Sequence, residues 1–201
     1  LWLKALAESD DAKGVVADAA LRERVLKVLA DPVVARAQMD VLTNWPVEIT
    51  RAITTKHAGG QRGAVLAAYD KALQRLEADA TLSRADRMGA LLGRIELARM
   101  DTRDDAKSVK LPPALARDVR EHVARDDREI TDGYERQAVI TTGAYALRRA
   151  GLMSESDALL KANLAKSHSP YYLMSALASN AKARGDKTLA LRWYEEAYRT
   201  S

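Results

Sequence analysis

The sequence predicts an all-α fold built from antiparallel helical hairpins. Alanine, leucine and arginine dominate the chain and phenylalanine is absent, a composition typical of good helix formers. Apolar residues recur at helical spacing, as at Met88, Leu91, Leu92 and Ile95. With 201 residues, of which 47% are hydrophobic and 30% charged, the chain is long enough to bury a substantial core.

Local signals place the helices of the N-terminal half. Asp31-Pro32 and Asn44-Trp45-Pro46 each put a capping residue before or near a proline, which suits the first turn of a helix. The glycine-rich stretch at residues 59–63 predicts a turn between two helices. Ser83, followed three residues later by Asp86, resembles a capping box. We therefore expect helices to start after each of these signals.

A polar stretch from Asp101 to Lys110, followed by Pro112-Pro113, is the best candidate for a domain boundary. It divides the chain into an N-terminal helical region, residues 1–105, and a C-terminal helical region, residues 106–201. Because the chain has no initiator methionine and Ser201 directly follows an amphipathic helix, we expect it to be a piece of a longer protein.

The C-terminal region is predicted to contain two long helices, at Pro113–Ile130 and Gly133–Ala150, followed by three shorter ones. Gly151 and Gly185 each follow a helix, as glycine commonly does. The signals for the following helix starts are Ser154 with Asp157, Ser169-Pro170, and Asp186.

The interval in sequence from Gly151 to Gly185 equals the period of the tetratricopeptide repeat, and we call it one repeat period. In the second repeat, Leu177 and Ala178 supply a large-small pair, and the next helix carries small, aromatic and small residues at Ala190, Tyr194 and Ala197. Antiparallel helices approach closely where small side chains meet and a ring fills the wedge beside them. Ala178 and Ala190 are therefore the predicted contact.

The preceding repeat matches less well. Ala144, Gly151, Ser156 and Leu160 agree in kind with the repeat, whereas Gly143 and Asn163 depart from it. The region at about 137–201 therefore resembles the tetratricopeptide family, which implies an α-solenoid that is most regular at the C-terminal end.

Tetratricopeptide arrays bind extended peptides or partner helices on the concave face of their first helices. That resemblance implies a peptide-binding face at Thr141, Tyr145, Arg148, Arg149, Tyr172, Ser175, Ser179 and Lys182. Its basic and aromatic residues suit a carboxylate or an acidic segment. The alternative is that Tyr145 and Tyr172 pack against neighbouring helices while the cations are ordinary solvated charges.

The segment at 167–181, SHSPYYLMSALASNA, resembles the C-terminal helical region of bacterial thioredoxin-family proteins described as disulfide isomerases. In that family a thioredoxin domain with a Cys-x-x-Cys pair precedes the helices, and this chain has no cysteine. The resemblance implies an accessory domain whose partner is a protein, a peptide or the missing domain of its own parent. It favours the bacterial periplasm slightly, with the cytoplasm as the alternative, and transfers no catalytic residue.

Several site types are not expected. The absence of cysteine excludes disulfides and thiolate metal sites from this chain. The net charge of +4 comes from 32 basic and 28 acidic residues that alternate along the helices, which argues against a nucleic-acid surface. No apolar run is long enough for a membrane span. We expect no cofactor.

Two polar groups have some of the residues of a metal site. His122 and Asp126 are four residues apart, but two ligands make no site, and an exposed polar pair is the preferred interpretation. Asp101, Asp104 and Asp105 lack the alternation and glycine of a calcium loop.

The preferred function is a non-catalytic protein-interaction domain, and two other classes stay open. One is an enzyme whose carboxylates lie between hairpins, for instance Asp126, Asp127 and Glu129 near Tyr134. The other is a structural spacer or oligomerisation module, which self-association in solution would reveal.

Overall fold

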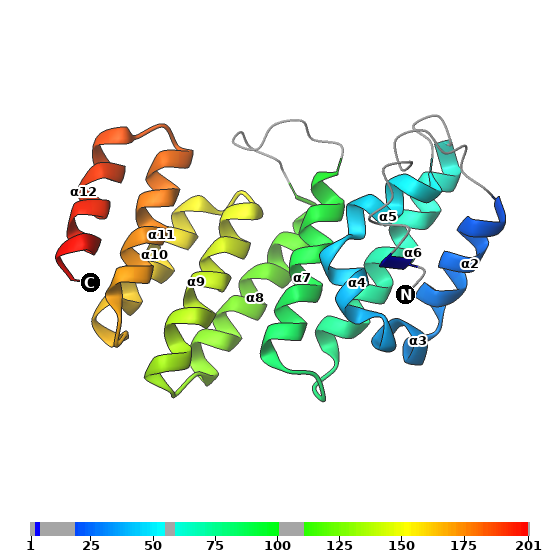
Figure 1. Cartoon of the computed structure of the whole chain (residues 1–201), viewed down its shortest axis with the longest axis horizontal. Coiled ribbons are helices and arrows are strands. Elements are labelled where there is room, and N and C mark those ends of the chain that lie inside the picture. Colours follow the sequence, from blue (N-terminus) through cyan, green and yellow to red (C-terminus); the bar gives the residue numbers. More distant parts are fainter. Residues whose placement is uncertain (1–2, 5–18, 55–58, 101–110, 201) are drawn as a thin grey trace. The chain divides into compact units, whose positions relative to one another are not determined.

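The computed structural model describes residues 3–4, 19–54, 59–100 and 111–200, and these residues form an all-helical protein (Figure 1). The described part contains eleven α-helices and one short 3-10 turn, and no strand. The predicted all-α fold class is confirmed. The chain divides into two compact units, Leu1–Met100 (unit 1) and Asp101–Ser201 (unit 2). The boundary predicted at about residue 105 lies outside the described residues.

Unit 1 is a long helical hairpin covered by four shorter helices. The hairpin consists of α6 (Gly59–Ala78) and α7 (Arg84–Arg99). The shorter helices are α2 (Ala19–Ala30), α3 (Pro32–Ala37), α4 (Met39–Asn44) and α5 (Pro46–Ile53). They pack on the hairpin mainly through contacts of α2 with α6 and of α4 and α5 with α7.

The predicted helix starts of unit 1 are mostly confirmed. The Asp31 side chain accepts hydrogen bonds from the backbone N–H groups of Val33 and Val34 at 2.9 and 3.3 Å, which caps α3. Ser83 caps α7 by accepting from the Asp86 N–H at 3.1 Å, and its hydroxyl donates to the Asp86 carboxylate at 2.7 Å. Pro46 occupies the first turn of α5.

The prediction of a turn at residues 59–63 is wrong, because α6 begins at Gly59 and runs through these residues. Glycine costs only about 1 kcal/mol relative to alanine inside a helix. A helix that continues for 20 residues and packs against α7 readily tolerates that cost.

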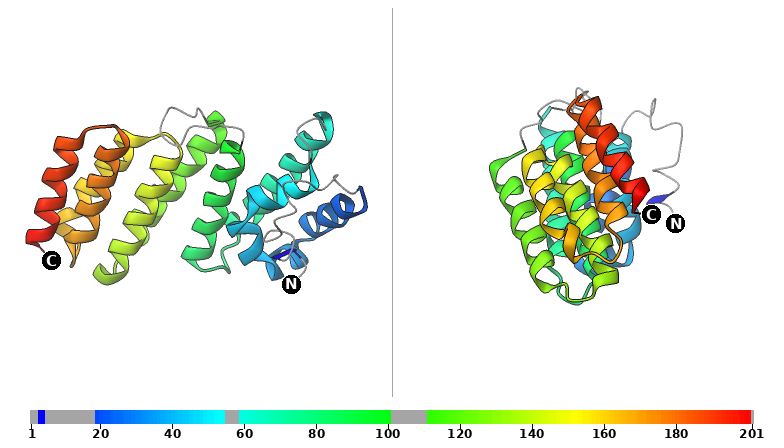
Figure 2. Two further views of the ribbon diagram at one scale, coloured as in Figure 1. Left: turned by 45° about the horizontal axis from the view of Figure 1, so that its top comes forward. Right: turned by 90° about the vertical axis from the view of Figure 1, so that its left-hand side faces the viewer.

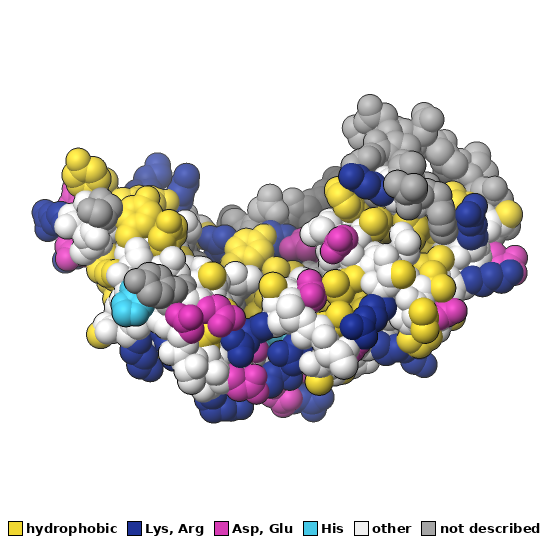
Figure 3. Space-filling view, turned by 60° about the horizontal axis from the view of Figure 1, so that its bottom comes forward, with side chains coloured by type: hydrophobic (Ala, Val, Ile, Leu, Met, Phe, Trp, Pro, Cys, Tyr) yellow, Lys and Arg dark blue, Asp and Glu magenta, His cyan; other side chains and the backbone are white. Residues whose placement is uncertain are grey.

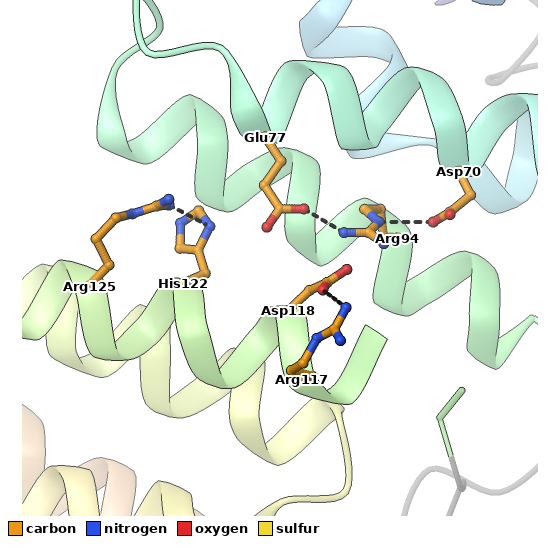
Figure 4. A network of polar contacts seen from close by, with 7 residues as sticks. All are labelled: Asp70, Glu77, Arg94, Arg117, Asp118, His122 and Arg125. Carbon is orange, nitrogen blue, oxygen red and sulfur yellow. Dashed lines mark hydrogen bonds and ion pairs between the residues drawn. The ribbon is translucent and has the colours of Figure 1, made fainter. Parts of the chain in front are cut away.

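Two buried polar groups fix unit 1 around its hydrophobic core. The fully buried Tyr69 donates its hydroxyl to the Leu42 carbonyl at 3.1 Å, and burial, together with the nearby Glu48 carboxylate, raises the pKa of Tyr69. Arg94 on α7 reaches two carboxylates of α6, Asp70 at 2.9 Å and Glu77 at 2.6 Å (Figure 4). Burial opposes the charge of Arg94, but these hydrogen bonds outweigh it and raise the pKa of Arg94.

Unit 2 is a series of antiparallel helices joined by short turns (Figure 1). Its elements are α8 (Pro113–Glu129), α9 (Gly133–Arg149), α10 (Met153–Asn163), the 3-10 turn η2 (Leu164–Lys166), α11 (Pro170–Ala183) and α12 (Lys187–Arg199). The helices α9 and α10 form one hairpin, and α11 and α12 form another. The first helices of the two hairpins, α9 and α11, also contact each other (Figure 2).

The turns of the two hairpins repeat the same geometry one repeat period apart. Gly151 and Gly185 have φ angles of 78° and 82°, a left-handed conformation that glycine adopts without strain. In the first turn, Gly151 N–H donates to the Arg148 carbonyl at 2.9 Å and Leu152 N–H to the Leu147 carbonyl at 2.8 Å. The same two bonds recur in the second turn. Both helices therefore end in a Schellman motif.

The equivalent bonds of the second turn join Gly185 to Lys182 at 3.0 Å and Asp186 to Ala181 at 3.0 Å. Asp186 also caps α12, as predicted, by accepting from the Leu189 N–H at 2.9 Å. Ser154 and Asp157 do not cap α10, which begins at Met153 without a side-chain cap. The Asp157 carboxylate is instead engaged by α11, as described below.

Candidate peptide-binding face

The eight predicted site residues lie on α9 and α11, the two first helices, which contact each other. We call this set the first-helix face: Thr141, Tyr145, Arg148 and Arg149 on α9, and Tyr172, Ser175, Ser179 and Lys182 on α11. Three pairs of positions lie one repeat period apart, because Thr141 matches Ser175, Tyr145 matches Ser179 and Arg148 matches Lys182. Because α9 and α11 contact each other, the equivalent positions of the two repeats lie on adjacent helices.

Aromatic side chains of the first-helix face are exposed. Tyr145 is 41% exposed and Tyr172 is 53% exposed, so neither ring is buried against a neighbouring helix. The Arg148 guanidinium lies 5.2 Å from the centre of the Tyr145 ring, within the range of a cation–π contact. Tyr172 packs edge-to-face against Tyr171, with ring centres 5.2 Å apart. These contacts hold the rings and the cation at the surface.

Charge is distributed unequally between the first and second helices of the hairpins. The two first helices carry four cationic side chains and one carboxylate, Glu135, which lies in the first turn of α9, far along the helix from Arg148. The two second helices carry four cationic and four anionic side chains. The first helices are therefore basic, whereas the second helices are neutral overall.

The hydroxyl groups of this face differ in availability. Thr141 donates its hydroxyl to the Gln137 carbonyl of its own helix at 2.7 Å, so this group is already engaged. Ser175 and Ser179 are half-buried on α11, and Lys182 is exposed at the end of that helix. The part of the face that offers polar groups to a ligand thus lies mainly on α11 and at the end of α9.

A buried polar network ties α9, α10 and α11 together beneath this face. Ser156, which is fully buried, donates its hydroxyl to the Ala144 carbonyl at 2.8 Å. The Asn180 amide donates to Ser156 Oγ and to Asp157 Oδ1, each at 2.8 Å. Arg184 forms an ion pair with Asp157 at 2.7 Å. The network sets the position of α11 against the first hairpin.

A second network holds the opposite ends of α8, α9 and α10. Arg136 donates to the Asp127 carboxylate at 3.2 Å, to the Asn163 side-chain oxygen at 3.0 Å and to the Ile130 carbonyl. Asn163 is fully buried and donates to the Leu159 carbonyl at 3.0 Å. The departure of Asn163 from the repeat pattern therefore has a structural reason, since its side chain accepts from Arg136.

The pair formed by His122 and Asp126 is buried, at 2% and 1% exposure, so its interpretation as an exposed pair is wrong. His122 Nε2 lies 3.4 Å from Asp126 Oδ2. On the other side of the ring, Arg125 Nη2 lies 3.0 Å from His122 Nδ1, the contact drawn in Figure 4. Because arginine only donates hydrogen bonds, His122 Nδ1 is the acceptor in this contact, and a neutral imidazole then carries its proton on Nε2. This arrangement suits an interior ion and hydrogen-bond cluster.

The carboxylates that could carry acid–base chemistry take different partners. Asp126 interacts with His122, whereas Asp127 is bound by Arg136 and Glu129 is exposed at the end of α8. The side chain of Tyr134 and all of His57, Asp101, Asp104 and Asp105 lie outside the described residues. Sequence adjacency on α8 thus does not place Asp126 and Asp127 in one site.

Metal and membrane sites are absent from the part of the chain that the structure describes. Its residues contain no group of three or more histidine, aspartate or glutamate side chains that could hold a metal ion. None of the described helices combines the length and apolar character needed to cross a bilayer.

Comparisons with known proteins assign no family. No protein-family model, curated protein or solved structure matches the chain. The resemblance to the thioredoxin family therefore has no support from these comparisons.

Proposed function

We propose that unit 2 is a non-catalytic helical-repeat domain that binds an extended acidic peptide segment of a partner protein on the first-helix face. The observation that carries this proposal is the segregation of charge onto α9 and α11, together with exposed tyrosines on the same helices. Arginine and lysine bind carboxylates by charge-assisted hydrogen bonds, and tyrosine supplies contact area with little loss of conformational entropy.

The repeated turn supports a repeat arrangement of these hairpins. The turns at Gly151 and Gly185 contain the same pair of backbone hydrogen bonds, and α9 contacts α11 directly. Two hairpins stacked in the same way present equivalent positions of their first helices side by side. In this proposal, Arg148 and Lys182 are two such equivalent cations, and the ligand crosses from one helix to the other.

The helix spacing sets the form of the ligand. Packed helices have axes about 8–10 Å apart. In an extended peptide, alternate side chains point the same way and are separated by about 7 Å. A segment with glutamates at alternate positions would therefore direct one carboxylate to Arg148 and another to Lys182, while its intervening apolar residues contact the tyrosines.

Fluorescence anisotropy with a labelled octapeptide of alternating glutamate and leucine tests this proposal. The wild-type chain should bind this peptide, and the counterpart with glutamine at every glutamate should bind at least about tenfold more weakly, or ~1.4 kcal/mol. Raising the salt concentration should weaken binding of the glutamate peptide, because exposed charges are screened.

Charge reversal locates the binding site. The double variant Arg148→Glu, Lys182→Glu should lose at least about tenfold in affinity for the glutamate peptide. The matched control is Arg192→Glu, an exposed arginine on the second helix α12, which should bind as the wild type does. Equal affinity of the double variant and the wild type would refute the proposed face, provided that both chains show the same helical circular dichroism.

We further propose that this domain is an accessory region of a thioredoxin-like thiol-disulfide protein. This proposal rests on the resemblance of the segment at 167–181 and on no residue of a redox site. Under it, the acidic segment belongs to a client protein or to another domain of the same parent, and the periplasm is the favoured compartment. Sequencing the parent reading frame for a Cys-x-x-Cys thioredoxin domain tests it, and finding none would remove it.

A further inference from the structure

The Tyr145 ring is exposed although the helices around it are in place. Its helix α9 contacts α8, α10 and α11, and the side chain is nevertheless 41% exposed. The Arg148 guanidinium lies over the ring, 5.2 Å from its centre, which restrains the ring from one face. The exposed part of the ring is therefore a fixed aromatic surface that a ligand can contact.

The position equivalent to Tyr145 on α11 carries a much smaller side chain. One repeat period after Tyr145 is Ser179, and one repeat period after Thr141 is Ser175. Both serines are half-buried, and a serine extends less far from its helix than a tyrosine. Because stacked repeats place equivalent positions side by side, the Tyr145 ring has small side chains next to it on α11. The two repeats thus differ here by the volume of one aromatic ring.

The cations of the face lie one step further along the same two helices. Arg148 and Lys182 each follow these positions by three residues, which corresponds to about 4.5 Å along a helix axis. In the proposed complex these cations bind two glutamates of an extended segment that crosses both helices. The residue between the two glutamates points the opposite way from them, because side chains alternate along an extended chain. That residue is therefore directed toward Tyr145 and Ser179.

We infer that the residue between the two glutamates is aromatic and that its ring packs against Tyr145 in the space above Ser179. The inference rests on the proposed function, and it makes Tyr145 and Ser179 the residues that select among acidic segments. Two aromatic rings in offset or edge-to-face contact gain free energy beyond that of the area they bury, which an aliphatic side chain does not. The occupant is thus a segment of a partner protein with the pattern glutamate, aromatic, glutamate.

The charge and apolar character of this surface agree with such an occupant. The helices α9 and α11 carry four cationic side chains and one carboxylate, so they favour a segment with more than one acidic residue. Figure 3 shows hydrophobic side chains gathered at the surface toward the α11 and α12 end of unit 2. An aromatic residue with an acidic residue on each side complements both features.

Fluorescence anisotropy with labelled peptides of the form Gly-Gly-Glu-Xaa-Glu-Gly-Gly tests the inference. The central residue is phenylalanine, leucine or alanine, and the two glutamates are the same in all three peptides. The phenylalanine peptide should bind the wild-type chain at least about threefold more tightly than the leucine peptide. It should bind at least about tenfold more tightly than the alanine peptide.

The variant Ser179→Tyr places a ring in the space proposed for the ligand. Its affinity for the phenylalanine peptide should fall at least about tenfold, whereas its affinity for the alanine peptide should change by less than about twofold. The alanine peptide therefore verifies that the cations still bind the glutamates. The matched control is Ser154→Tyr, which adds the same side chain at an exposed position of the second helix α10 and should bind all three peptides as the wild type does.

The variant Tyr145→Leu removes the ring but keeps an apolar side chain. The affinities for the phenylalanine and leucine peptides should then agree within about 1.5-fold. Any displacement of Arg148 would weaken both peptides alike, so the ratio of the two affinities reports on the ring. The matched control is Tyr198→Leu, which changes a tyrosine of α12 that is 81% exposed and should keep the preference for phenylalanine.

The possible results separate this inference from the proposed function. Equal binding of the phenylalanine and leucine peptides to the wild-type chain would overturn the inference and leave the acidic site standing. A preference for phenylalanine that survives both Ser179→Tyr and Tyr145→Leu would also overturn it, provided that circular dichroism shows unchanged helices. Binding of none of the three peptides would overturn the proposed function as well, since each of them carries both glutamates.

Discussion

The two hairpins of unit 2 have turns of the same geometry, but different side chains hold each hairpin to the helices beside it. Both end their first helix with a left-handed glycine and the same pair of hydrogen bonds. The second helix of the first hairpin, α10, presents Ser156 and Asp157 to Asn180 of α11. The second helix of the second hairpin, α12, has Ala190 and Leu191 at those positions, and the Leu191 side chain is 59% exposed.

This comparison distinguishes the residues that form a hairpin from the residues that join one hairpin to the next. The turn and the small residues Ala144, Ala178 and Ala190 determine how the helices of one hairpin meet. The polar network appears only where a following helix covers the hairpin, because Asn180 belongs to that helix. Stability should therefore depend on the turns in both hairpins, and also on the buried hydrogen bonds of Ser156 within the first hairpin and of Asn180 between the hairpins.

The largest effect is expected from Asn180→Ala, which removes the side-chain hydrogen bonds of Asn180 between the hairpins. The substitution deletes two hydrogen bonds and leaves a small cavity at a site that is 3% exposed. We expect the free energy of unfolding to fall by about 2–3 kcal/mol, measured by urea denaturation. A loss below about 0.5 kcal/mol would show that the network does not hold α11 in place.

Alanine at either turn glycine should have the next largest effect. At Gly185 nothing lies within 4 Å of the added Cβ, so the cost comes from the left-handed backbone alone. We expect Gly185→Ala and Gly151→Ala each to lower the free energy of unfolding by about 1–2 kcal/mol. Clearly unequal losses in the two denaturation curves would contradict the equivalence of the turns.

Ser156→Ala gives the first hairpin the residue of the second. It removes the hydroxyl that donates to the Ala144 carbonyl, while the Asn180 amide keeps its bond to Asp157. We expect a loss of about 1 kcal/mol in the free energy of unfolding. An unchanged denaturation midpoint would show that the Ser156 hydroxyl contributes nothing to the stability of this interface.

The smallest effect is expected from the reciprocal change, Ala190→Ser. A serine there can donate to the Ala178 carbonyl, which lies one repeat period after its counterpart, the Ala144 carbonyl. Because the new hydrogen bond offsets the burial of a hydroxyl group, the free energy of unfolding should change by less than about 0.5 kcal/mol. A loss above about 2 kcal/mol would show that the two sites differ in shape.

The sequence predicted the features that depend on local chemistry. The turn glycines, the caps at Asp31, Ser83 and Asp186, and the all-α class were recognised because each depends on residues close together in the chain. The contact of Ala178 with Ala190 stays a prediction, and both residues are buried, as that contact requires.

The sequence did not predict features that depend on distant partners. Asn180 binds side chains 23 and 24 residues away, and Asn163 binds Arg136 27 residues away. Tyr194 was expected to fill a wedge between helices, but its side chain is 43% exposed. The placement of His122 inside the protein likewise follows from tertiary packing and not from its neighbours in sequence.

The most direct test of the proposed function is nuclear magnetic resonance mapping of the labelled chain with the octapeptide of alternating glutamate and leucine. The account predicts that the largest amide shifts occur on both first helices, around Tyr145 and Arg148 on α9 and around Ser175, Ser179 and Lys182 on α11. Shifts confined to a single helix, or located on α10, α12 or unit 1, would contradict a face shared by two repeats.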